Sequence, residues 1–196
     1  MIDLDKTALV LIGFQNDYFA DSGLVHSVID DPCRYTQVIN HTTTLIEHWI
    51  GTPATIIATP ITFTPTYEEL VDPVGILKMV QDLNAFQKGT PGAAIIKELA
   101  PFREHIVEVT GKRGLNAFAD TELDAVLQQK GIQSVVLAGA VTSICIDSTG
   151  RSAHERGYQV SILKDCIISR TTLEQEFYVE NIFPLYATVA ESSQLF

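Results

Sequence analysis

Short runs of consecutive apolar residues alternate along the chain with longer segments in which apolar residues recur every three or four positions. The runs cover 7–13, 54–60, 105–110, 134–140, 158–164 and 186–190. Continuous apolar runs of this length are typical of parallel strands that are covered on both faces of a sheet. The pattern therefore predicts a sheet of six mainly parallel strands.

Helical spacing occupies the segments between these runs, at 34–50, 92–99, 121–130, 143–156 and 173–183. Gly131 and Gly157 follow two of the segments, at the place where a left-handed residue commonly ends a helix. Strands that alternate with helices predict a three-layer α/β/α, Rossmann-like domain with right-handed crossovers. We expect one such domain to account for residues 1–196.

One edge of the predicted sheet should carry the functional site. Ligands of open parallel sheets bind outside the carboxyl ends of the strands, where Gly13, Pro60 and Ala140 are expected to gather. The stretch 60–91 is rich in Pro, Thr and acidic residues and is predicted to be irregular. A connection of that length in a compact domain is more often functional than idle.

Composition narrows the classes of partner. Of 196 residues, 46% are hydrophobic and 19% charged, which indicates an ordinary globular chain. Thirteen basic against twenty-four acidic residues give a net charge of −11, which argues against nucleic acid or an anionic membrane surface as a partner. No apolar run approaches the ~20 residues that span a bilayer.

The amino-terminal residues and the cysteines bear on location. Acidic residues precede the first apolar run in "MIDLDKTALVLIG", so we do not expect a signal peptide. Cys33, Cys145 and Cys166 are an odd number of cysteines without a secretion signal. Three free thiols in a reducing cytoplasm are therefore predicted.

Cys145 is the strongest candidate for chemistry. In "VVLAGAVTSICIDSTG" a strand ends, a short turn follows, and Cys145 falls in the first turn of the next predicted helix, with Thr142 or Ser143 as the candidate N-cap. Unpaired amides and the positive end of a helix lower the pKa of a thiol and can hold an oxyanion. The alternative is a small buried hydrophobic residue, which is what a free cysteine usually is.

Lys112 is the candidate partner of this thiol. It follows the third predicted strand and so belongs to the same edge of the sheet. An ammonium group beside a thiolate stabilises the thiolate. The alternative is an ordinary solvated lysine.

Three segments in order resemble one known family. They are "GFQNDYF", "KRGLNAF" and "GAVTSICIDSTGRSA", and "KGTPGAAIIKEL" at 88–99 adds a fourth similarity. This sequence resembles the isochorismatase-like cysteine hydrolases, whose motifs run D-x-Q-N-D-F, K-x-x-x-S-A-F and G-x-x-T-x-x-C. The resemblance covers nearly the whole chain and is weakest at 60–85.

The resemblance implies a role for each matching residue. Cys145 would be the nucleophile that forms a covalent adduct, and Lys112 would polarise the thiol. The Ala140–Val141 peptide matches a bond that is usually cis in the family, and the amides of Val141 and Cys145 would face the oxyanion. The resemblance also implies a homodimer or homotetramer, and no cofactor.

Gly13 departs from the family pattern, because it stands where the family carries an aspartate that relays a proton to the leaving group. A water molecule, or a carboxylate of the loop at 60–85 where the resemblance is weakest (the divergent loop), would then have to move the proton. Asp17 is a weaker substitute. The loop candidates are Glu68, Glu69 and Asp72. Otherwise the substrate has an easier leaving group or brings its own acid, or the protein binds its ligand without hydrolysing it. A missing carboxylate should also free the volume of a side chain and favour a bulkier or less cationic ligand.

Metal binding is not expected. The stretch "ATPITFTPTYEELVDP" lacks the Asp-x-His pair that nicotinamidases use for zinc, and the five histidines show no ligand spacing. The predicted pocket is lined by aromatic side chains that could equally pack in the core: Phe14, Tyr18, Phe63, Tyr67 and Phe118.

The sequence therefore favours a hydrolase of a small-molecule C–N bond that works without a cofactor through Cys145. A catalytically silent relative that binds a small molecule or a protein is the alternative. A vinyl ether hydrolase of the isochorismate type is a third candidate.

Overall fold

A computed structural model describes residues 2–195 and contains one sheet of six strands. The strands are β1 (Thr7–Ile12), β2 (Thr55–Thr59), β3 (Ile106–Glu108), β4 (Ser134–Ala140), β5 (Gln159–Ile168) and β6 (Thr188–Ala190). All five strand pairings are parallel. The predicted fold class is confirmed, and the strands lie within two residues of the predicted runs except at the end of β5.

The strand order places a switch point next to β1. The order is β3-β2-β1-β4-β5-β6, so the chain winds in one direction from β1 to β3 and in the other from β4 to β6. Ligand sites of open parallel sheets lie where the order reverses, at the carboxyl ends of the strands. Here that point lies between Gly13, just after β1, and Ala140, at the end of β4.

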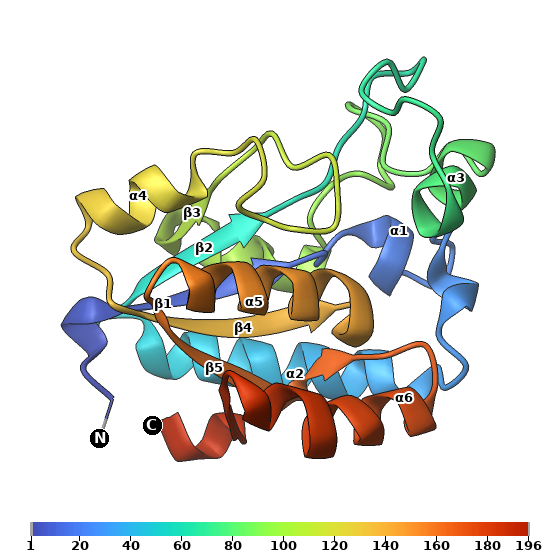
Figure 1. The fold of residues 1–196 in the computed structure, drawn as a ribbon. Helices are drawn as coiled ribbons and strands as arrows, with labels where there is room; N and C mark the ends of the chain where they lie inside the picture. The colour runs from blue at the N-terminus through green and yellow to red at the C-terminus, as the bar shows by residue number, and fades with distance from the viewer. Residues whose placement is uncertain (1, 196) are drawn as a thin grey trace.

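Alternation along β1 divides the core into two layers. All six residues of β1 are buried. Leu9 and Leu11 pack with the inner face of α2 (Cys33–Trp49), while Ala8 and Val10 pack on the opposite face of the sheet. Helix α2 therefore covers one face, and α4 (Leu123–Gln129) and α5 (Asp147–Glu155) cover the other (Figure 1).

Most of the predicted helices are present, with two differences. Helix α3 (Gly75–Asp82) lies inside the stretch that was predicted to be irregular, where it projects beyond the carboxyl edge with its connecting loops (Figure 1). The helix predicted at 92–99 is wrong, because residues up to 96 form turns and a bridge and a 3-10 helix follows at Lys97–His105. The remaining α-helices are α1 (Asn16–Phe19) and α6 (Thr172–Phe177), and a π-helical turn (Thr142–Ile146) precedes α5.

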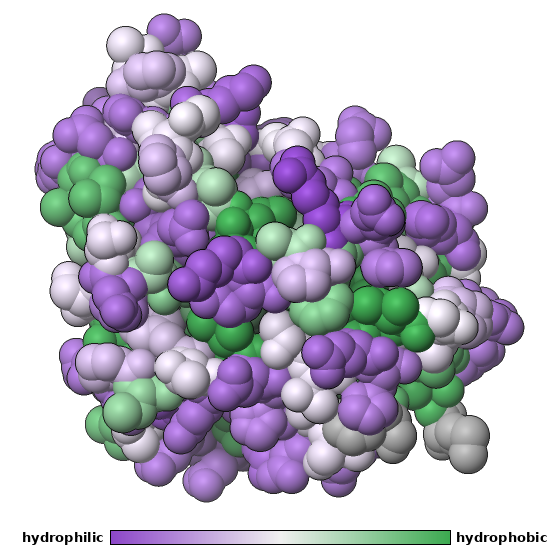
Figure 2. Space-filling model, turned by 180° about the vertical axis from the view of Figure 1, so that it is seen from behind, coloured by the Kyte–Doolittle hydropathy of each residue, from purple (hydrophilic) through white to green (hydrophobic). Residues whose placement is uncertain are grey.

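The surface is mixed in polarity. Hydrophilic residues dominate the face opposite to that of Figure 1, and the hydrophobic areas on it are separated from one another (Figure 2). Among residues 2–195, no helix combines the length and the apolarity that crossing a bilayer requires.

Candidate active site

Lys112 and Cys145 lie next to each other at the carboxyl edge of the sheet. The Lys112 Nζ atom is 3.7 Å from the Cys145 Sγ atom and also donates to the carbonyl oxygen of Gly114. A bridge between Ile61 and Lys112 extends the strand pairing past β2 and fixes the start of this segment. Lys112 is 2% exposed and Cys145 4%, so this pair of polar groups is shielded from bulk water.

Cys145 belongs to the π-helical turn that follows β4. The carbonyl oxygen of Val141 accepts hydrogen bonds from the amides of Ile144 and Ile146, both at 3.1 Å. The Ala140–Val141 peptide is cis, as the resemblance implies. The strand therefore turns sharply and presents Cys145 at the switch point.

Thr142 and Ser143 do not cap a helix, so that prediction is wrong. The Thr142 hydroxyl donates to the Gln175 side-chain oxygen at 2.9 Å, and the Ser143 hydroxyl donates to the Glu174 carboxylate. Both acceptors lie on α6. Gln175 in turn donates to the carbonyl oxygens of Lys164 and Ile167 in β5, so a chain of hydrogen bonds connects the Cys145 turn to the sheet.

Gly13 occupies a tight backbone position beside this turn. Its φ is 72°, and its carbonyl oxygen accepts a hydrogen bond from the Gln15 amide at 2.7 Å. A Cβ atom at position 13 would lie 3.0 Å from the Ala140 carbonyl oxygen and 3.4 Å from the Tyr18 ring. The Tyr18 ring and the Ala140 carbonyl therefore border the space that a side chain at position 13 would fill, and the preference for a bulkier or less cationic ligand stays a prediction.

Gln15 organises the loops around the site, which the sequence reasoning missed. Its side-chain nitrogen donates to the carbonyl oxygens of Ile61 and Ala93, both at 2.8 Å, and its side-chain oxygen accepts from the Ile61 amide at 2.9 Å. The residue is completely buried. Only its place in the motif "QND" marked it, since its partners are far away in the sequence.

Asp17 serves the same loops. One carboxylate oxygen accepts from the Phe86 amide at 2.6 Å and the other from the Leu24 amide at 3.2 Å. A Cβ atom at Gly92 would lie 2.3 Å from the same carboxylate, so only glycine fits there. Asp17 therefore holds the loops in place, and both of its oxygens are already engaged.

The three acidic residues of the divergent loop are placed differently from one another. Glu69 accepts hydrogen bonds from the Thr64 amide and hydroxyl and pairs with Arg113 at 3.4 Å. Burial raises the pKa of Glu69, but these hydrogen bonds and the charge of Arg113 outweigh burial and leave the pKa below its usual value. Glu68 is exposed and bonded to Thr66, whereas Asp72 lines a cavity.

Four of the five predicted aromatic residues pack together and one lies elsewhere. Phe14 stacks on Phe19 with ring centres 4.8 Å apart, and Phe63 packs on Tyr67 at 5.3 Å. Both pairs belong to the hydrophobic cluster that includes Tyr18. The structure does not bring Phe118 to them, because Phe118 lies under Arg156 on the other face of the sheet.

A cavity of about 750 Å³ opens beside the Cys145 turn. Its wall includes Ile144, the neighbour of Cys145, and Leu115, the neighbour of Gly114. The divergent loop supplies Asp72 and a mainly apolar stretch from Pro73 to Leu77, and Arg170 supplies a second charge. The lining is therefore mainly apolar and could take a small organic molecule.

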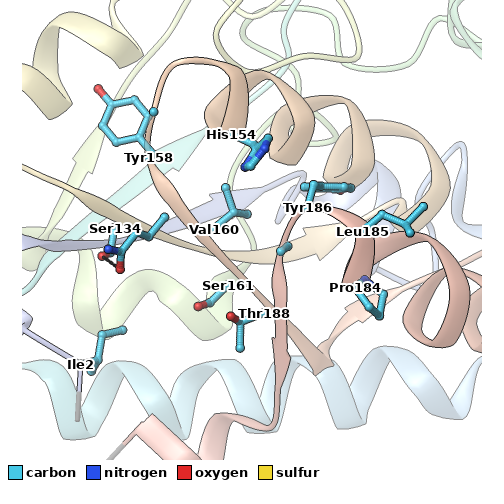
Figure 3. Close-up of a pocket in the computed structure, with 13 residues that line it drawn as sticks. Ile2, Ser134, His154, Tyr158, Val160, Ser161, Pro184, Leu185, Tyr186 and Thr188 are labelled. Atoms are coloured by element: carbon cyan, nitrogen blue, oxygen red, sulfur yellow. Dashed lines mark hydrogen bonds between the residues drawn. The ribbon is translucent and has the colours of Figure 1, made fainter.

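Another cavity, of about 540 Å³, lies at the opposite edge of the sheet (Figure 3). Ser134, the first residue of β4, lines it together with His154, Tyr158 and Tyr186 (Figure 3). Cys145 follows the other end of β4, so this cavity is separate from the Lys112–Cys145 pair.

A family model for the isochorismatase domain matches residues 7–194. The chain belongs to the isochorismatase family. The resemblance read from the three motifs is thereby confirmed, and with it the expectation of a hydrolase.

Relatives within the isochorismatase family include both uncharacterised proteins and amidohydrolases. The uncharacterised isochorismatase family protein YddQ of Bacillus subtilis is 29% identical over 173 residues, which cover 87% of this chain and 81% of YddQ. The ureidoacrylate amidohydrolase RutB of Methylorubrum extorquens is 25% identical over 175 residues, which cover 83% of this chain and 70% of that protein.

A solved structure shares the isochorismatase-family fold over nearly the full chain. The cysteine hydrolase of Pseudomonas syringae pv. phaseolicola superposes with a TM-score of 0.87 and 18% sequence identity, covering 99% of this chain and 92% of that one. At this identity the superposition concerns the fold, and the chemistry has to be argued from the residues of the site.

The residues that could hold a metal ion are not grouped. Within residues 2–195, no three His, Cys, Asp or Glu side chains are arranged so that they could share a metal ion.

Proposed function

We propose that this chain is a cofactor-independent cysteine hydrolase that cleaves an amide-like C–N bond of a small molecule through a covalent intermediate on Cys145. The observation that carries the proposal is the buried contact of 3.7 Å between Lys112 Nζ and Cys145 Sγ. An ammonium group at this distance favours the thiolate, which is the nucleophilic form of cysteine.

The proposed reaction has two stages. The Cys145 thiolate attacks the carbonyl carbon of the substrate, and the oxyanion that forms is bound by the backbone amides of Val141 and Cys145. The C–N bond then breaks, and water hydrolyses the thioester. Lys112 is held by Gly114 on its other side, so its ammonium group remains beside the sulfur throughout.

The substrate is proposed to be a small molecule with an apolar part. The cavity beside the Cys145 turn is lined mainly by aliphatic side chains, with Arg170 and Asp72 as its charged residues. Amidohydrolases among the relatives, such as RutB and the maleamate amidohydrolase of Pseudomonas putida, support an amide-like bond.

A silent relative that only binds its ligand is the second candidate function. One observation favours it, which is that Gly13 supplies no carboxylate at the carboxyl end of β1. Without a group that protonates the leaving nitrogen, an amide would not be cleaved at a useful rate.

Assembly and location are part of the same proposal. We expect a homodimer or homotetramer in the cytoplasm, with a small molecule as the ligand. Large apolar side chains such as Val71 (86% exposed), Leu173 (77%) and Phe177 (51%) support an assembly, because a subunit contact would cover them.

Replacing Cys145 tests the proposed function. We expect Cys145→Ala to abolish hydrolysis of amides and of p-nitrophenyl esters while the protein keeps its thermal unfolding transition. Intact-protein mass spectrometry should find the acyl adduct on wild type and not on the variant. Cys33→Ala is the matched control, because Cys33 is an exposed thiol away from the site. Full activity in Cys145→Ala would overturn the nucleophile assignment.

A further inference from the structure

The space beside Gly13 is bordered by the Tyr18 ring. The Cδ2 and Cε2 atoms of Tyr18 lie 3.4 and 3.5 Å from where a Cβ atom of residue 13 would be. The ring packs on Phe86 with centres 4.9 Å apart, and Tyr18 is 4% exposed. An aromatic side chain with a hydroxyl group therefore stands next to the position where the family carries an acid.

The Tyr18 hydroxyl is unusual among the buried tyrosines because it is unpaired. Tyr35 donates to the His26 carbonyl oxygen at 2.7 Å, and Tyr67 donates to the Ala85 carbonyl oxygen at 2.6 Å. Tyr18 has no such partner among residues 2–195. Among residues 2–195, the hydroxyls that are both fully enclosed and without a partner are those of Thr42 and Ser169. The Tyr18 hydroxyl is not one of them, so its oxygen is in contact with solvent. A donor left open at a site is available to a ligand.

Tyr18 and Cys145 influence each other electrostatically. Burial raises the pKa of Tyr18 well above its usual value, and the negative charge of the Cys145 thiolate raises it further. The hydroxyl therefore keeps its proton while the thiolate is free. Once the thiolate has attacked the carbonyl carbon, its charge has moved to the oxyanion of the tetrahedral adduct, and the proton of Tyr18 is easier to give as the C–N bond breaks.

We propose that the Tyr18 hydroxyl is the catalytic acid of this site and donates its proton to the leaving nitrogen, a step that rests on the proposed cysteine hydrolase function. Attack forms the S–C bond and moves the carbonyl π pair onto oxygen. When that pair returns, the C–N bond breaks and its electrons take the proton from the Tyr18 oxygen. A water molecule then gives a proton back to the Tyr18 oxygen while the water oxygen attacks the thioester carbon. The C–S bond breaks, and its electron pair returns to the Cys145 sulfur.

Tyr18→Phe tests this acid because it removes one oxygen and keeps the ring contacts. The probes are the primary amide and the p-nitrophenyl ester of acetic, butyric and benzoic acids. An amine must be protonated to leave, whereas p-nitrophenolate leaves as an anion. Amide turnover should fall on the order of 10²-fold or more in the variant. The burst of p-nitrophenolate that reports acylation of Cys145 should keep its rate.

Two further variants make the result specific. Tyr35→Phe also removes a buried tyrosine hydroxyl, but one that is bonded to His26, and it should leave the ratio of amide to ester rates unchanged. Asp72→Asn tests the rival acid, because Asp72 lines the cavity beside the Cys145 turn. A selective loss of amide cleavage in Asp72→Asn, with Tyr18→Phe unaffected, would overturn the proposal.

The outcomes separate this inference from the proposed function. Wild-type protein that shows the ester burst but cleaves none of the amides would overturn the role of Tyr18, because no group of the site would then protonate a leaving nitrogen. Loss of the ester burst in Cys145→Ala would still support the assignment of Cys145 as the nucleophile. An equal loss of amide and ester rates in Tyr18→Phe, with a lowered melting temperature, would show a structural role only and would also overturn the proposal.

Discussion

Gly13 combines a backbone requirement with a chemical one. Its φ of 72° lies in the left-handed region, where residues with a side chain are strained. A Cβ atom at this position would approach the Ala140 carbonyl oxygen to 3.0 Å, which adds a steric cost, since that oxygen belongs to the backbone. The backbone conformation and the close contact with Ala140 therefore explain a glycine at this position without any loss of catalysis.

Substitutions at Gly13 separate these two explanations. We expect Gly13→Asp and Gly13→Asn to destabilise the protein by about 1–3 kcal/mol in urea unfolding, because both place a side chain at a strained position. Both should also lower amide turnover, since the added atoms would crowd Tyr18. The two side chains have nearly the same shape and differ in charge. A gain of turnover in the Asp variant alone would instead favour the silent relative, in which the carboxylate is the missing part.

The sequence located some residues of the site and not others, for a physical reason. Lys112 and Cys145 stand in ordered motifs four and five residues after the ends of strands β3 and β4, where local patterns predict the edge of a sheet. Gln15 and Gln175 act through partners that only the folded chain brings close. The motif predicts that Tyr18 lines the pocket. Whether its hydroxyl has a hydrogen-bond partner depends on which residues the folded chain brings near it, and a sequence pattern does not indicate that.

At the scale of elements, α6 acts as a brace for the turn that carries Cys145. Thr142 and Ser143 both donate their hydroxyl protons to consecutive residues of this helix. Thr171 begins α6 by accepting a hydrogen bond from the Glu174 amide, and Arg170 pairs with the Glu174 carboxylate at 3.1 Å. The position of the thiol is therefore coupled to a helix that follows β5.

Thr142→Val tests this brace. The variant leaves the buried Gln175 oxygen without its donor, so we expect a loss of about 1–3 kcal/mol in the free energy of unfolding. The rate of alkylation of Cys145 by iodoacetamide should also change, because the turn is less well held. Thr43→Val is the matched control, since the Thr43 hydroxyl bonds only within α2, and it should leave both measurements nearly unaltered. Identical behaviour of the two variants would mean that α6 does not position the turn.

The elements themselves were predicted unevenly. Strands β1 and β4 were found because their apolar runs are continuous and buried on both faces. Helix α3 was missed because it is only eight residues long, begins at Gly75, and lies within a stretch whose Pro, Thr and acidic residues indicate irregular structure. The helix predicted at 92–99 is absent because the backbone around Gly92 pairs with Asn16 and Asp17 instead.

At the scale of the whole molecule, charge opposes compactness. The chain carries eleven more acidic than basic residues. Three of the ion pairs among residues 2–195 have both side chains about half exposed, where each contributes little. Repulsion among the excess carboxylates is screened by salt over about 10 Å at 0.1 M ionic strength. The folded state should therefore gain more from screening than the expanded unfolded chain does.

The melting temperature should rise with salt at neutral pH. Between low salt and about 0.2 M NaCl we expect an increase of a few degrees, since about 1 kcal/mol corresponds to roughly 2–4 °C in a domain of this size. Differential scanning fluorimetry measures it, and KCl should act as NaCl does if the effect is screening. A fall of the melting temperature would mean that ion pairs outweigh the repulsion.

Gln15 has a consequence for the order in which the protein folds. Its side chain joins residues 46 and 78 positions further along the chain, at Ile61 and Ala93. Closing such long loops costs chain entropy before the contact offsets it, which is why non-local contacts form slowly. The strands next to β1 can associate before these loops are fixed. The site around Cys145, by contrast, needs the segments of Gln15, Ile61 and Ala93 to be in place together. A newly made chain would thus acquire its architecture first and its reactive centre last, so that the thiol meets its lysine only in a molecule that is otherwise complete.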